Sequence, residues 1–101
     1  MEPMKAPSSR TREAAETLAI QALAFIAAEP ERLEGFLGAT GLTVDRLRES
    51  ADAPDFLGGV LEHMLADESL LLAFADSAGI DPAAVGRARN ALGGNWERDI
   101  P

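Results

Sequence analysis

Apolar residues recur along the chain three and four positions apart, which is the spacing of an α-helix that buries one face. The first stripe begins after Ser9 and Thr11, two candidate N-caps, and stops before Pro30. Proline is tolerated only in the first turn of a helix, so it ends this segment or begins the next. The stripe that we expect to face the core consists of Ala15, Leu18, Ala19, Ala22, Leu23 and Ile26.

Helix-ending and helix-starting residues divide the following sequence into further segments. Gly41 and Gly79 suit the left-handed conformation that closes helices. Thr43, Asp67 and Asp81 are suitable N-caps for the segments that follow them. No segment alternates like a strand, so the sequence predicts an all-α bundle of five or six short helices. The apolar positions of these segments are Leu33, Phe36 and Leu37; Val44 and Leu47; Leu57, Val60, Leu61, Met64 and Leu65; Leu70, Leu71, Leu72, Phe74 and Ala75; and Val85, Ala88 and Leu92.

The length of 101 residues leaves room for one domain. Residues 1–8 contain two prolines and are expected to form a flexible leader. Asp52 and Pro54 are expected to open the fourth helix, and Gly93 with Gly94 to end the sixth. We therefore assign residues 9–94 to a single helical domain and residues 95–101 to a C-terminal tail that contains Trp96.

The segments also match one another at an offset of 38 residues. Similar helix punctuation can produce such spacing by chance. The simultaneous agreement of phenylalanine, glycine and cap positions instead favours two pseudo-repeats, near residues 15–50 and 53–88, that pack into one compact bundle. The matched pairs include Leu33 with Leu71, Phe36 with Phe74, Gly41 with Gly79, and Thr43 with Asp81.

Charge makes a nucleic-acid partner a poor expectation. Seventeen acidic side chains against nine basic ones give a net charge of −8. Contact with phosphate groups depends on clustered Lys and Arg, which this composition does not favour. The candidate basic patch is a set of arginines that occupy related places in the two pseudo-repeats, namely Arg46, Arg48, Arg87 and Arg89.

The candidate catalytic residues each have a structural explanation. The chain has no cysteine, and His63, the one histidine, lacks the second histidine of the HExxH zinc motif. Asp67 and Glu68 lie at an expected helix start, where negative charge is stabilised. Gly58 and Gly59 fall inside a helical stripe without the lysine of a phosphate loop, so we expect them to permit close helix approach. The sequence therefore predicts neither an enzyme nor a cofactor or metal site.

The N-terminal region superficially resembles a signal peptide, because three basic residues precede an apolar stretch from residue 18 to 28. Glu13 and Glu16 lie directly before that stretch, Gln21 interrupts it, and Glu29 with Pro30 stands where cleavage would occur. No segment reaches the ~18 apolar residues of a transmembrane helix. We therefore expect no membrane association and a cytoplasmic location, with which the lack of cysteine agrees.

An interaction surface is the leading functional hypothesis. Three consecutive leucines cover more than one face of a helix, so their helix is either central to the monomer or shared with a partner. The expected surface comprises Ile20, Leu70, Leu71 and Leu72, and the partner is another protein or a second copy of the chain. The alternatives are weak nucleic-acid binding, or a small apolar ligand held between the two halves near Phe36, Phe56, Phe74 and Met64.

A resemblance to a known family covers nearly all of the chain outside its tails. The sequence around Gly41, Leu42 and Thr43, and the matching one around Gly79, Ile80 and Asp81, is similar to that of a family of small uncharacterised alphaproteobacterial proteins. These motifs are helix punctuation and no catalytic signature. The family is a domain of unknown function, so the resemblance implies a bacterial cytoplasmic setting and transfers no site residues.

Overall fold

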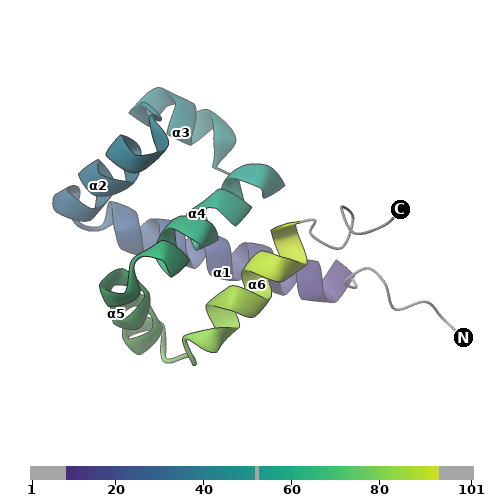
Figure 1. Ribbon diagram of the computed structural model, residues 1–101. Coiled ribbons are helices and arrows are strands. Elements are labelled where there is room, and N and C mark those ends of the chain that lie inside the picture. The colour runs from purple at the N-terminus through teal and green to yellow at the C-terminus, as the bar shows by residue number, and fades with distance from the viewer. Residues whose placement is uncertain (1–8, 52, 94–101) are drawn as a thin grey trace, which may run out of the picture.

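The computed structural model describes residues 9–51 and 53–93. Within this part the chain forms six α-helices and no strand, which confirms the all-α prediction. The first three helices are α1 (Ser9–Ala27), α2 (Pro30–Thr40) and α3 (Val44–Ser50). The last three are α4 (Pro54–Ala66), α5 (Glu68–Ala78) and α6 (Ala83–Gly93). Figure 1 shows α4 and α6 crossing in front of the long α1.

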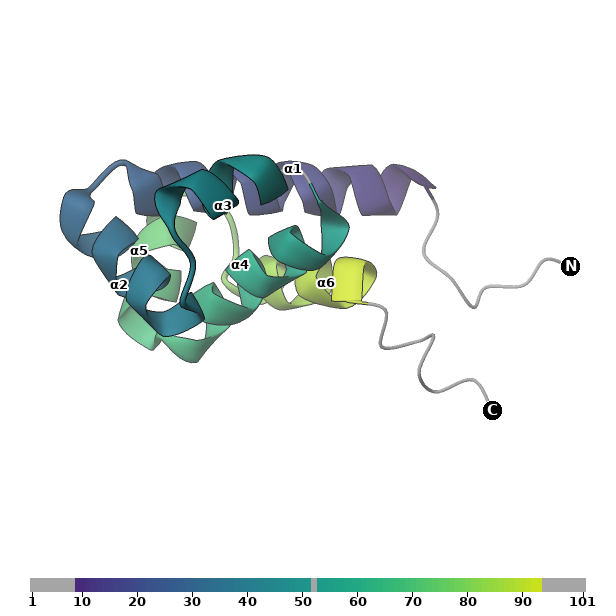
Figure 2. The same ribbon diagram turned by 90° about the horizontal axis from the view of Figure 1, so that it is seen from above.

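The core lies where α1, α4 and α6 pack against one another, while α2 contacts α1 and α5 contacts α4. Seen from above, α1 forms one layer, and α2 and α5 lie at the end of the molecule opposite to the start of α1 (Figure 2). Small side chains make up most of the α1 contribution, so neighbouring helices can approach it closely. The buried core residues are Ala15, Ala19, Ala22, Ile26, Phe36, Leu57, Val60, Leu61, Met64, Phe74, Ala75, Val85, Ala88 and Ala91.

Helix ends follow the predicted punctuation at most positions. Gly41 and Gly79 adopt left-handed backbone with φ of 75° and 69°, and each closes the helix before it. The Thr43 hydroxyl accepts a hydrogen bond from the Arg46 amide, and the Asp67 carboxylate accepts one from the Leu70 amide. These contacts satisfy amides that have no partner within the first turn of a helix.

The other predicted helix starts agree only in part with the structure. The Asp81 carboxylate accepts a hydrogen bond from the Ala83 amide, as a cap does, but α6 begins only after Pro82. Helix α1 already includes Ser9 and Thr11, so neither precedes it as an N-cap. Pro54 opens α4 as predicted, while Asp52 and the leader and tail lie outside the described residues.

The spacing of the pseudo-repeats is visible in helix positions but not in packing. Helices α2 and α5 start and end 38 residues apart, at Pro30 and Glu68 and at Thr40 and Ala78. The third helices differ: α6 packs extensively on α4, whereas α3 has no comparable contact with α1 and buries no residue. Figure 1 shows α3 away from α1. The predicted two-fold repeat is therefore not confirmed as a three-dimensional arrangement.

Gly58 and Gly59 do not mark a close approach of helices, which corrects the expectation from their position in the apolar stripe. A methyl group built at either residue would have no atom of a neighbouring helix within 4 Å in the described part of the chain. Gly59 is exposed and Gly58 half-buried.

Candidate functional site

An open apolar groove of about 310 Å³ lies between the first half of α1 and the length of α6. Residues three and four positions apart line both walls, because such spacing places them on one face of each helix, and five of the eight are alanines. Their short side chains leave a depression that longer side chains would fill. The lining residues are Thr11, Ala14, Ala15, Leu18, Ala84, Arg87, Ala88 and Ala91.

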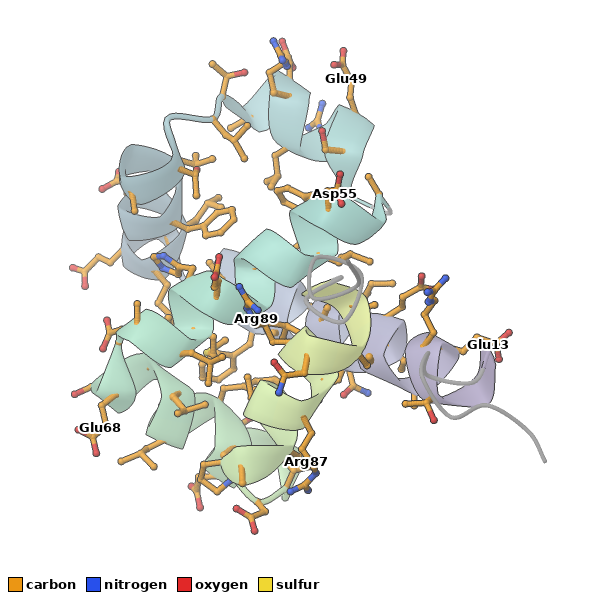
Figure 3. All side chains as sticks on the ribbon, turned by 45° about the vertical axis from the view of Figure 1, so that its right-hand side comes forward. Glu13, Glu49, Asp55, Glu68, Arg87 and Arg89 are labelled. Carbon is orange, nitrogen blue, oxygen red and sulfur yellow. The ribbon has the colours of Figure 1, made fainter. Side chains whose placement is uncertain are left out.

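Arg87 supplies the charge at this groove. Its side chain is exposed and has no ion pair within the described residues. Arg89, two positions later on α6, projects toward α4 and pairs there with Glu62 (Figure 3). The two arginines therefore lie on different sides of α6, and only Arg87 is available to a molecule in the groove.

The remaining arginines of the expected basic patch lie on another part of the surface. Arg46 and Arg48 are exposed on α3, which forms no extensive contact with α6. Since α3 and α6 pack differently, the related sequence positions do not become related positions in space. The four arginines therefore do not form one patch. Arg46 and Arg48 are exposed on α3, Arg87 lies at the groove, and Arg89 forms an ion pair with Glu62.

The expected interaction surface, formed by Ile20, Leu70, Leu71 and Leu72, also separates into buried and exposed side chains. Leu70 and Leu71 are half-buried and pack against the core. Leu72 faces solvent with 49% of its surface exposed, and Ile20 on α1 does so with 48%. Each of these two side chains lies on the face of its helix that points away from the buried residues. The third large apolar side chain with comparable exposure in the described part is Val44, at 45%.

The residues expected around an apolar ligand belong to the core or pack against it. Phe36, with 1% of its surface exposed, lies between two α4 side chains. Its ring centroid is 6.0 Å from that of Phe56 and 5.0 Å from that of His63, both edge-on. Phe74 and Met64 are buried as well. His63 therefore packs against an aromatic ring.

Neither a metal site nor a membrane-spanning helix is found among the described residues. No group of three or more His, Asp or Glu side chains there is arranged to hold a metal ion. No helix in that part of the chain combines the length and the apolar character required to cross a membrane.

Comparison with known protein families gives a match over residues 12–95 to the family described as "Protein of unknown function (DUF3572)". The chain belongs to this family. The match covers all six helices except the start of α1. No curated protein and no solved structure matches the chain. The DUF3572 match thus confirms the resemblance to a domain of unknown function.

Seven of the eight groove residues fall within the DUF3572 match, and Thr11 lies just before it. The sequence had indicated Ala15, Leu18 and Ala88 as core positions, without indicating a groove. The signal that could have found it is the spacing of Ala84, Ala88 and Ala91, which places small side chains along one face of the last helix.

Proposed function

We propose that this DUF3572 protein is a non-catalytic interaction module that receives an apolar side chain of another protein in the α1–α6 groove. The observation that supports it is the combination of alanine-lined walls with an exposed Arg87 at the rim, which forms no ion pair with any described residue. Buried apolar anchors and arginines contribute most of the energy at many protein interfaces. The complementary partner segment presents an aliphatic or aromatic side chain next to a carboxylate.

The size of the groove favours a side chain over a complete ligand. Its volume of about 310 Å³ is at the lower end of the ~300–1,000 Å³ typical of ligand pockets. A groove open to solvent covers only part of a molecule that it binds, which suits a side chain held in place by the rest of a partner protein. Binding of a free small apolar ligand is the second outcome that an experiment must distinguish.

The charge of the chain favours another protein as the partner over a second copy of the chain or a nucleic acid. Two copies of the chain would each bring a net charge of −8, which opposes self-association. Binding of nucleic acid requires a concentrated basic surface. The four arginines of the candidate basic patch are instead divided between α3 and α6, and Arg89 is paired with Glu62. The proposal retains the bacterial cytoplasmic setting that the family resemblance implies.

Affinity purification from the native organism tests this function when the protein is compared with matched variants. Arg87→Glu reverses the charge at the groove, and Ala14→Glu places a charged side chain at its exposed edge. Arg46→Glu makes the same charge change on α3 and serves as the control. Light scattering of each purified protein reports self-association.

We expect a partner protein that the wild type and Arg46→Glu recover equally. Loss of about 1.4 kcal/mol of binding energy in either groove variant would lower its affinity about tenfold. Recovery of the same proteins by all four chains would contradict the proposal. A groove-dependent small molecule without a protein partner would replace it with ligand binding.

A further inference from the structure

We infer that the C-terminal segment 94–101 of this chain occupies the α1–α6 groove when no partner is bound, with the Trp96 ring between the alanine walls. This inference uses the groove of the proposed function but does not depend on the identity of a partner. Trp96 lies one residue beyond the DUF3572 match, so the inference concerns this chain and not its family.

The position of the groove brings it within reach of this segment. Helix α6 ends at Gly93, and Ala91, two residues earlier, lines the groove. Figures 1 and 2 show that the end of α6 and the start of α1 lie at the same end of the molecule. Three residues of extended chain span roughly 10 Å, so Trp96 can reach the groove if the chain reverses after Gly93. Gly94 follows directly and imposes the least restriction on such a reversal.

The chemistry of the segment complements the groove. Trp96 is the only tryptophan in the chain and offers a large apolar surface to the alanine walls. Glu97, Arg98 and Asp99 follow it with a net charge of −1, and Arg87 has no ion pair within the described residues. Arg87 lies six residues before Gly93, which is about 9 Å along the helix axis, so a reversed segment of six residues passes it.

The N-terminal segment 1–8 is a poorer match for the same groove. It contains no aromatic residue, and its charged residues are Glu2 and Lys5, which cancel. The C-terminal segment instead has an aromatic ring, followed by two carboxylates and one arginine that leave a net charge of −1. Occupation by this segment would make a partner compete with the chain itself.

The fluorescence of Trp96 tests the inference directly, because the chain has one tryptophan and no tyrosine. The full chain is compared with Arg87→Glu, with Ala14→Glu and with the control Arg46→Glu, after circular dichroism shows that each is folded. We expect emission at shorter wavelength and weaker acrylamide quenching in the wild type and in Arg46→Glu than in the denatured chain. Both groove variants should shift toward the denatured values.

Wild-type emission equal to that of the denatured chain would overturn the inference, as would a short-wavelength emission that neither groove variant changes. A blue shift that appears only at high protein concentration would also overturn it, because the segment would then bind a second copy. A solvent-exposed Trp96 together with groove-dependent partner capture would remove this inference alone. A protected Trp96 without any partner would remove only the proposed function.

Discussion

The guanidinium group of Arg32 lies 4.0 Å from the centroid of the Phe25 ring and donates a hydrogen bond from Nη1 to the Phe25 carbonyl oxygen at 3.2 Å. Arg32 belongs to α2, and the Phe25 carbonyl lies in the last turn of α1, where carbonyl groups have no helical partner. The Phe25 ring also contacts Phe74 of α5 at 5.5 Å between centroids. One arginine thereby connects the end of α1 to the packing of two other helices.

Replacing Arg32 by alanine should lower the free energy of unfolding by about 1–2 kcal/mol, because both a cation–π contact and a charge at a helix C-terminus are lost. Arg46→Ala, at an exposed position on α3, should change it by less than about 0.5 kcal/mol. Urea denaturation followed by circular dichroism measures both. Equal effects of the two substitutions would show that the Arg32 contact contributes nothing particular.

Two apolar residues of α5 should differ sharply in their effect on stability. Phe74 has 2% of its surface exposed, whereas Leu72 has 49%. Phe74→Ala should cost about 3–5 kcal/mol through lost burial and the cavity that remains. Leu72→Ala should cost less than about 0.5 kcal/mol, because its side chain is already half in water. The midpoints of urea denaturation compare them, and a large loss for Leu72→Ala would indicate that this side chain is covered in solution.

The helix-interior glycines offer a stabilising change. Gly58→Ala and Gly59→Ala should each raise the free energy of unfolding by about 0.5–1 kcal/mol, since the added methyl group meets open space and alanine favours the helix. Gly79→Ala is the matched control and should lower it by about 1 kcal/mol, because φ there is 69°. Thermal denaturation reports the sign of each change. Destabilisation by Gly58→Ala would mean that another helix does approach this position.

The ion pair between Glu62 and Arg89 should stabilise the protein only slightly. Glu62 keeps 59% of its side chain exposed, so water screens the attraction. A double-mutant cycle with Glu62→Gln and Arg89→Gln should give a coupling energy of about 0.2–1 kcal/mol. The coupling should weaken further in high salt. A coupling well above this range would show that the pair is more shielded than its exposure indicates.

The sequence predicted most of the local structure, because helix ends depend on residues close to them. Thr43 and Asp67 cap their helices through hydrogen bonds to amides three residues later. Gly41 and Gly79 end theirs through hydrogen bonds to carbonyl groups three or four residues earlier. Packing of α3 was not predictable in this way. Its position depends on contacts between residues far apart in the sequence. Helices α3 and α6, which have similar capping residues, therefore lie in different environments.

The candidate site was less predictable than the fold. Alanine has the same helical spacing whether it faces a neighbouring helix or lines a groove, and only the arrangement of α1 against α6 decides between them. The positions of Arg87 and Arg89 show the same limit. They are two residues apart in the sequence, yet one reaches the groove while the other pairs with Glu62 of α4.

Site-specific photo-crosslinking in the native organism tests the recognition role of the groove most directly. A photoreactive residue at Ala14 lies at the groove, and one at Ala24 lies on an exposed face of the same helix as a control. We predict one dominant protein adduct from position 14, reduced by Arg87→Glu, and none of comparable yield from position 24. Equal adducts from both positions, or adducts that Arg87→Glu leaves unchanged, would contradict the assignment of the α1–α6 groove as the binding surface.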